Sequence, residues 1–112
     1  MSNTLEDRVF AALADSRRRE IMERLANEGN KTATELAQEL PITRQGISKH
    51  LNILAEANLV SVQQTGRDKR YSVTPQSLAE AVTWLESITA VWDQRLQALY
   101  NHLVSDEEQT HE

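Results

Sequence analysis

The fold is decided by residues 32–57, which read TATELAQELPITRQGISKHLNILAEA. Thr32 and Glu35 have the spacing of a capping box at the start of a helix, and Pro41 predicts the end of that helix after about two turns. Thr43 is placed to cap a second, longer helix that runs to the end of the segment. The apolar positions of this longer helix recur at helical spacing, at Ile47, Leu51 and Leu54. A short helix, a tight connection and a longer helix together indicate a helix-turn-helix motif.

Two further helices are predicted before this segment. Apolar residues at helical spacing mark the first of them over residues 5–13. Asp15 is placed to cap the second, and Gly29 lies just beyond its expected end. The buried face of the second helix is predicted to consist of Ile21, Met22 and Leu25.

After the helix-turn-helix, the pattern changes from helices to strands. Residues 59–63 and 70–73 are rich in β-branched residues, and Gly66 lies in the turn between them. We therefore predict a two-stranded hairpin over residues 60–73. Because an isolated hairpin is only marginally stable, it must pack on the helices, and directly after a helix-turn-helix it is interpreted as a wing.

The last predicted element is a long helix over residues 75–104, with Thr74 as its cap and Pro75 in its first turn. Its main apolar stripe follows alternating spacings of four and three, with one polar position, through Leu78, Val82, Leu85, Thr89, Trp92, Leu96, Leu99 and Leu103. Further apolar residues widen the stripe beyond a two-stranded seam: Ala81, Trp84, Ile88 and Val91. Residues 105–112 are polar and acidic, and we predict a flexible tail there.

Together these elements predict a mainly helical (α+β) fold, a winged helix-turn-helix with about five helices and a two-stranded β-hairpin wing, in one domain over residues 1–104. The 112 residues include no cysteine, which excludes a disulfide framework and thiolate metal ligands. No apolar run is long enough to span a membrane, and the first residues lack the features of a secretory signal. We therefore expect a cytoplasmic protein that makes no membrane contact.

The net charge of −5 would by itself argue against a nucleic-acid partner, but the charge is unevenly distributed. Residues 31–73 hold six basic and four acidic side chains, whereas residues 74–112 hold one basic and seven acidic side chains. The helix-turn-helix and hairpin are therefore locally basic. A solvated charged surface is the simple explanation for so small an excess, and a nucleic-acid partner is the alternative.

The outward face of the helix over residues 44–57 favours the nucleic-acid alternative. With the apolar positions turned inward, the outward side chains are Gln45, Ser48, Lys49 and Asn52. This face has no carboxylate before Glu56, whereas ordinary polar helix faces usually include some. Gln and Asn pair with adenine edges, Lys donates to guanine, and Ser serves either bases or phosphate. Thr43 and Arg44 lie at the helix N-terminus, where backbone N–H groups favour phosphate.

Three cations lie around the hairpin turn, at Arg67, Lys69 and Arg70. We predict that they contact DNA phosphates or probe the minor groove. The alternative for the hairpin alone is a turn that merely adds solubility. His50 flanks the apolar stripe of its helix, so it is predicted either to contact a phosphate or to pack against the core.

Several short segments carry a family likeness in their order and spacing. They are residues 11–15 (AALAD), Arg18, Arg19, Ile21, residues 34–37 (TELA), 48–51 (SKHL) and 54–60 (LAEANLV), and Gly66 with Arg67 before Tyr71. Over nearly the whole chain they resemble the ArsR/SmtB family of winged helix-turn-helix regulators. The resemblance implies a homodimer that binds double-stranded operator DNA, usually as a repressor. It also implies a dimer interface that uses the N- and C-terminal helices. The stripe of the C-terminal helix fits this interface through Leu78, Val82, Leu85, Trp92, Leu96, Leu99 and Leu103.

Metal-sensing members of that family carry a cysteine pair in the helix that residues 34–40 form here, and this segment has neither cysteine nor histidine. His102 and Asp106, four residues apart, could supply half of a site shared across a dimer. We expect no metal and no cofactor, as in the metal-independent branch of the family. A metal-responsive repressor that uses His102 and Asp106 is an alternative.

No catalytic residues are predicted, because the chain has no cysteine nucleophile and no glycine-rich phosphate loop. Ser48 and His50 diverge on their helix and cannot form a nucleophile–base pair. The sequence thus predicts a DNA-binding repressor rather than an enzyme, and it indicates no inducer. The alternative from another class is a winged-helix module that binds a protein partner through Trp84, Trp92 and the apolar stripe.

Overall fold

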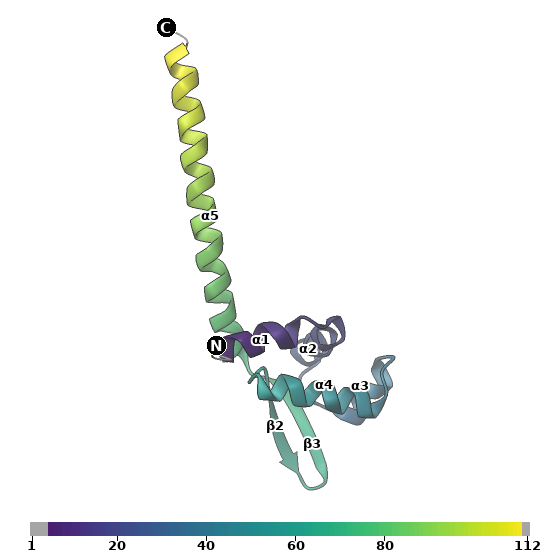
Figure 1. Cartoon of the computed structure of the whole chain (residues 1–112). Helices are drawn as coiled ribbons and strands as arrows, with labels where there is room; N and C mark the ends of the chain where they lie inside the picture. The colour runs from purple at the N-terminus through teal and green to yellow at the C-terminus, as the bar shows by residue number, and fades with distance from the viewer. Residues whose placement is uncertain (1–4, 111–112) are drawn as a thin grey trace. The chain divides into compact units, whose positions relative to one another are not determined.

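A computed structural model describes the backbone of residues 5–110 and the side chains of residues 5–105 (Figure 1). The chain divides into two compact units, of which the first ends at Ala81 and the second begins at Val82. The elements in chain order are α1 (Leu5–Leu13), α2 (Ser16–Glu28), β1 (Lys31–Thr32), α3 (Ala33–Glu39), α4 (Arg44–Glu56), β2 (Val60–Thr65), β3 (Asp68–Val73) and α5 (Pro75–Thr110). Five helices and a wing confirm the predicted winged helix-turn-helix fold.

The predicted helix caps at Asp15, Thr32 and Thr43 are confirmed. Asp15 precedes α2 and accepts a hydrogen bond from the Arg17 backbone N–H at 2.8 Å. Thr32 and Glu35 form both bonds of the capping box before α3. The Thr43 hydroxyl accepts from the Gly46 N–H at 3.1 Å, which satisfies a backbone donor in the first turn of α4.

Gly46 itself allows the turn between α3 and α4 to be tight. A Cβ atom at this position would lie 2.9 Å from the Ile42 side-chain methyl Cγ2 and 3.2 Å from Thr43 Oγ1. Any larger residue would therefore push the connection away from the start of α4.

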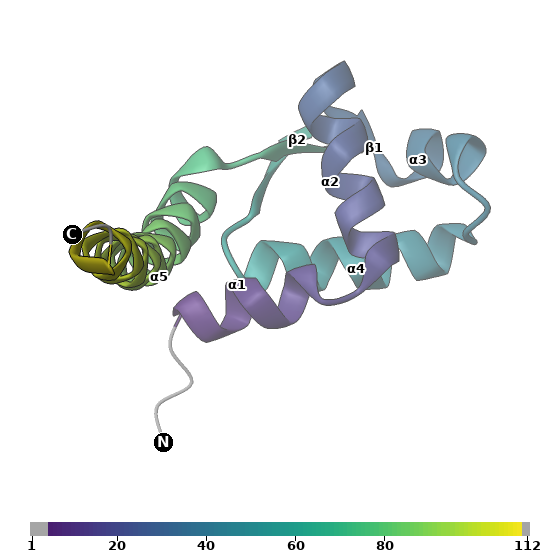
Figure 2. The ribbon, with the colours of Figure 1, turned by 90° about the horizontal axis from the view of Figure 1, so that it is seen from above.

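α4 is the central helix of the first unit and lies beside α1, α2 and α3 (Figure 2). Its predicted inward residues are fully buried: Ile47, Leu51 and Leu54. They pack in one core with buried side chains from the other elements, including Ile21, Leu36 and Leu59. The helix that presents the outward polar face is thus fixed by the best-buried side chains of the molecule.

Leu51→Ala is expected to lower the free energy of unfolding by about 2–5 kcal/mol, because it leaves a cavity where Leu51 is completely buried. Urea denaturation at a fixed protein concentration measures this change. Asn52→Ala on the exposed side of α4 is the control and is expected to change stability by less than about 0.5 kcal/mol. Equal losses for the two variants would contradict the burial pattern.

The sheet has three strands rather than the predicted two, in the order β1-β3-β2, all antiparallel. The additional strand β1 covers two residues, with Lys31 opposite Tyr71 and Thr32 opposite Arg70. So short a segment has no alternating pattern by which the sequence could indicate a strand. The predicted hairpin is present, with Val60 paired to Val73 and Thr65 to Asp68.

α5 begins at Pro75 as predicted, but it continues to Thr110 instead of ending near residue 104. The segment 105–110 is therefore helical, since no glycine or proline interrupts it; residues 111 and 112 lie outside the described part of the chain. Leu78 and Ala81 pack with the core of the first unit.

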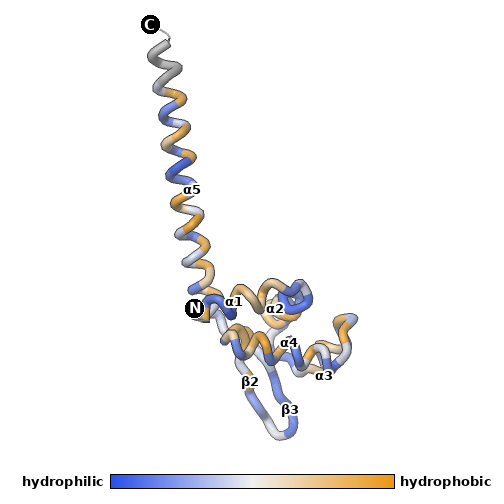
Figure 3. The backbone as a smooth tube through the Cα atoms, viewed as in Figure 1, coloured by the Kyte–Doolittle hydropathy of each residue, from blue (hydrophilic) through white to orange (hydrophobic). Residues whose placement is uncertain are grey.

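Beyond Ala81, large apolar side chains recur along α5 with polar ones between them (Figure 3). Each is between 44% and 63% exposed, and they are Val82, Trp84, Leu85, Ile88, Val91, Trp92, Leu96, Leu99, Tyr100 and Leu103. The second unit therefore carries a stripe of exposed apolar side chains. None of the described helices combines the length and the apolar character needed to cross a membrane.

Candidate nucleic-acid interface

An open cleft of about 670 Å³ lies between α3, the outward face of α4 and the wing formed by β2 and β3. The polar and charged side chains that α4 and the wing contribute to it are Arg44, Ser48, Asn52, Arg67, Asp68, Lys69 and Arg70. The cleft thus brings together predicted DNA contacts from two segments that are separate in the sequence. Its wall holds four basic side chains against two acidic ones, Glu35 and Asp68, which favours an anionic partner.

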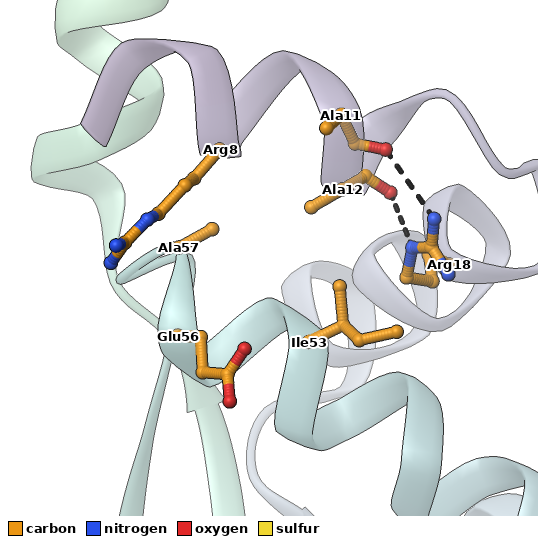
Figure 4. Close-up of a pocket in the computed structure, with 7 residues that line it drawn as sticks. All are labelled: Arg8, Ala11, Ala12, Arg18, Ile53, Glu56 and Ala57. Atoms are coloured by element: carbon orange, nitrogen blue, oxygen red, sulfur yellow. Dashed lines mark hydrogen bonds between the residues drawn. The ribbon is translucent and has the colours of Figure 1, made fainter. Parts of the chain in front are cut away.

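The outward face of α4 extends beyond the cleft wall. Gln45, Lys49 and Asn52 are exposed, and Ser48 is partly buried. Glu56, the one carboxylate of α4, lines a separate hollow of about 560 Å³ between α1, α2 and α4 (Figure 4). No carboxylate of α4 therefore lines the cleft.

Arg44 is anchored across the helix-turn-helix. Its Nε donates a hydrogen bond to Thr34 Oγ1 at 3.0 Å, and this bond joins the start of α4 to α3. The bond holds a cation at the N-terminus of α4, where the backbone N–H groups already favour an anion.

The structure places His50 on the side of α4 that faces Arg18 of α2, away from the cleft. Its Nδ1 lies 3.4 Å from Arg18 Nη1. Arg18 also donates to the Ala12 carbonyl at 2.6 Å and to the Ala11 carbonyl at 3.3 Å, and Figure 4 shows these two bonds. His50 contacts Arg18 and does not line the cleft, and its contact with a DNA phosphate stays a prediction. No sequence pattern indicates the contact with Arg18, because the two residues are 32 positions apart in the chain.

The three wing cations do not share one environment. Arg67 and Lys69 are exposed at the end of the hairpin, and neither side chain has a hydrogen bond or ion pair within the described residues. The sequence predicted Arg70 at the hairpin turn. In the structure it lies within the sheet, paired in register with Gln63 and Thr32. Its Nη1 lies 3.2 Å from Glu35 Oε1.

Glu35 lies beside the cations that the sequence predicts to bind DNA, but it was not itself predicted as part of the site. Its spacing from Thr32 was already explained by the capping box. The Thr32 backbone N–H donates to Glu35 Oε1 at 2.9 Å. That hydrogen bond, followed by the charge of Arg70, holds the pKa of Glu35 below its usual value. Glu35 is therefore ionised at neutral pH.

The metal alternative concerns His102 and Asp106 of α5. Among the described side chains, no group of three or more His, Asp or Glu residues could hold a metal ion. His102 lies on the exposed part of α5, whereas the side chain of Asp106 lies outside the described residues.

A helix-turn-helix followed by a basic wing, with one cleft between them, defines a winged helix-turn-helix DNA-binding protein. Residues 13–63 match a family described as "Helix-turn-helix domain". The chain is 39% identical over 101 residues to the HTH-type transcriptional regulator Rv2034 of Mycobacterium tuberculosis, with 90% of each chain covered. It is 35% identical over 77 residues to the transcriptional repressor SdpR of Bacillus subtilis, covering 69% of this chain and 84% of that one.

A solved structure of an ArsR-like transcriptional regulator from Rhodococcus sp. RHA1 has 38% sequence identity and a TM-score of 0.80. The match covers 94% of this chain and 98% of that one. The chain belongs to the ArsR family of winged helix-turn-helix transcriptional regulators. It is a DNA-binding regulator of transcription.

Proposed function

We propose that the protein is a homodimeric repressor that occupies a pseudo-palindromic operator and blocks access of RNA polymerase to the promoter. One observation carries this proposal: Arg44, Ser48 and Asn52 of α4 line the same cleft as the wing cations, and no carboxylate of α4 faces it. In this proposal the protein acts in the cytoplasm on double-stranded DNA and has no catalytic role. The relative named as a transcriptional repressor supports the direction of regulation.

In this proposal, α4 enters the major groove with Gln45, Ser48, Lys49 and Asn52 toward the base edges. Thr43 and Arg44 bring the positive N-terminus of the helix to a phosphate. Two copies related by a two-fold axis would place their α4 helices about one helical turn of DNA apart, or a multiple of it. The operator is therefore an inverted repeat.

The apolar stripe of α5 supplies the dimer interface in this proposal, because its side chains are exposed in the single chain and a second copy can cover them. The residues we assign to the seam are Leu78, Val82, Leu85, Trp92, Leu96, Leu99 and Leu103. Leu78 already packs on the core of its own chain, so it lies at the edge of the seam.

Arg67→Glu is expected to weaken binding to all DNA sequences to a similar degree, since the wing contacts phosphates and not bases. The slope of log K against log salt should become less steep by at least about 0.9, the value for one phosphate contact. Fluorescence anisotropy over a series of salt concentrations measures the slope. Arg24→Glu, an equal charge change on α2 away from the cleft, is the control. An unchanged slope for Arg67→Glu would remove the wing from the phosphate contacts.

The function as a whole is tested with the DNA directly upstream of the protein's own coding region. We expect an inverted repeat there that is retarded in a gel by the purified protein, and transcription from that promoter that falls when the protein is added. Binding without preference for any upstream sequence, or a rise in transcription, would contradict the proposed repressor.

A further inference from the structure

We propose that Glu35 is a specificity-determining residue of DNA binding: it holds the guanidinium of Arg70 back from DNA phosphates and so lowers the affinity for DNA of any sequence. The inference rests on the proposed role of the cleft in DNA binding. Of the three wing cations, Arg67 and Lys69 are then available to phosphates, whereas Arg70 is not.

Arg70 is held by two acceptors of its own chain. Arg70 Nη1 lies 3.2 Å from Glu35 Oε1 and 3.3 Å from Asn30 Oδ1, so two acceptors lie against the same nitrogen. The side chains of Arg70 and Glu35 are 38% and 45% exposed, and both line the cleft. A DNA phosphate that enters the cleft would therefore compete with Glu35 for the same cation.

The Glu35 side chain is held in place by the capping box of α3. Its Oε1 accepts from the Thr32 N–H at 2.9 Å, and its own N–H donates to Thr32 Oγ1 at 3.1 Å. The carboxylate cannot turn away from the cleft without breaking the cap of α3. An approaching phosphate consequently meets a negative charge beside Arg70.

The backbone of Arg70 is held between two neighbouring strands. β3 is the central strand of the sheet, and it pairs Arg70 with Thr32 on one side and with Gln63 on the other. Because Thr32 also caps the helix that carries Glu35, the same short segment holds both partners of the ion pair. Arg70 is therefore kept beside Glu35 by the sheet as well as by its charge.

The consequence concerns specificity. Phosphate contacts supply most of the binding that is independent of sequence, whereas base contacts distinguish one sequence from another. A cation that is neutralised within the protein weakens the phosphate contacts and leaves the base contacts unchanged. The ratio of operator affinity to random-DNA affinity rises as a result.

The test uses the full-length chain, a duplex of random sequence and the variant Glu35→Gln. Glutamine keeps the acceptor for the Thr32 N–H and hence the cap, but it removes the charge that neutralises Arg70. We expect tighter binding to random DNA and a salt slope steeper by about 0.9, one additional phosphate contact. Glu39→Gln is the matched control, since Glu39 is on the same helix, pairs with Lys31 at 2.8 Å and does not line the cleft.

Arg70→Gln completes the test. We expect it alone to leave the salt slope nearly unchanged, and in its background Glu35→Gln should no longer steepen the slope. Equal effects of Glu35→Gln and Glu39→Gln would overturn the proposal, as would a Glu35→Gln effect that persists without Arg70. A wild-type chain that binds no duplex would instead refute the DNA-binding role of the cleft.

Discussion

Leu96→Asp is expected to convert the proposed dimer into monomers. Leu96 is 49% exposed in the single chain and lies in the middle of the apolar stripe of α5, so dimerisation would bury it. Placing an unpaired carboxylate in an apolar interface costs about 3 kcal/mol or more for each copy. With two copies per dimer, the dissociation constant should rise by about ten-thousand-fold or more.

Sedimentation equilibrium measures the change in association. Gln94→Asp adds the same charge on the polar side of α5 and is the control, which should remain dimeric. Operator affinity should fall together with dimerisation, because a monomer occupies one half-site only. A Leu96→Asp variant that still sediments as a dimer would remove α5 from the interface.

The double variant Gln45→Ala, Lys49→Ala is expected to lose most of its preference for the operator over random DNA. Both side chains are exposed on the outward face of α4, where they would reach base edges in the major groove. Each bidentate base contact is worth about 1–3 kcal/mol of discrimination, so the ratio of the two affinities should fall by about a hundred-fold or more.

Competition between labelled operator and random duplex, at one salt concentration, measures that ratio. Gln38→Ala removes an exposed glutamine of α3, a helix to which no base contact is assigned, and it should leave the ratio unchanged. If the double variant discriminated between the two duplexes as well as the wild type does, α4 would not be the element that reads the bases.

Local chemistry explains why so much of the fold could be predicted from the sequence. Asp15, Thr32 and Thr43 cap the helices that they precede, and each does so through a hydrogen bond to a backbone N–H within three residues. Pro75 starts α5 for an equally local reason, since its fixed backbone angle suits a first helical turn. The inward face of α4 follows from spacing alone.

The features that the sequence did not indicate depend on contacts between distant residues. Arg70 and Glu35 are 35 residues apart, and Arg18 and His50 are 32 residues apart. Neither pair has a spacing pattern, because both form only when the wing and α2 pack against the helix-turn-helix. β1 was missed for the same reason, as its two residues form a strand only through β3.

The partition of charge gives a physical reason for a DNA-binding protein with a net charge of −5. Residues 74–112 hold one basic and seven acidic side chains, while the cleft holds four basic and two acidic ones. A protein with little overall attraction to phosphate depends more on base contacts for its affinity. The Glu35–Arg70 pair would act in the same direction within the cleft.

The most direct test of the central claim, that the outward face of α4 and the wing bind DNA, is a map of backbone amide shifts. Isotopically labelled wild-type protein is titrated with a duplex that carries the inverted repeat. We expect the largest shifts at Gln45, Lys49 and Asn52 and at the end of the wing, with little change at Arg24 on α2. Shifts confined to α1 or α5, with α4 unaffected, would contradict the claim.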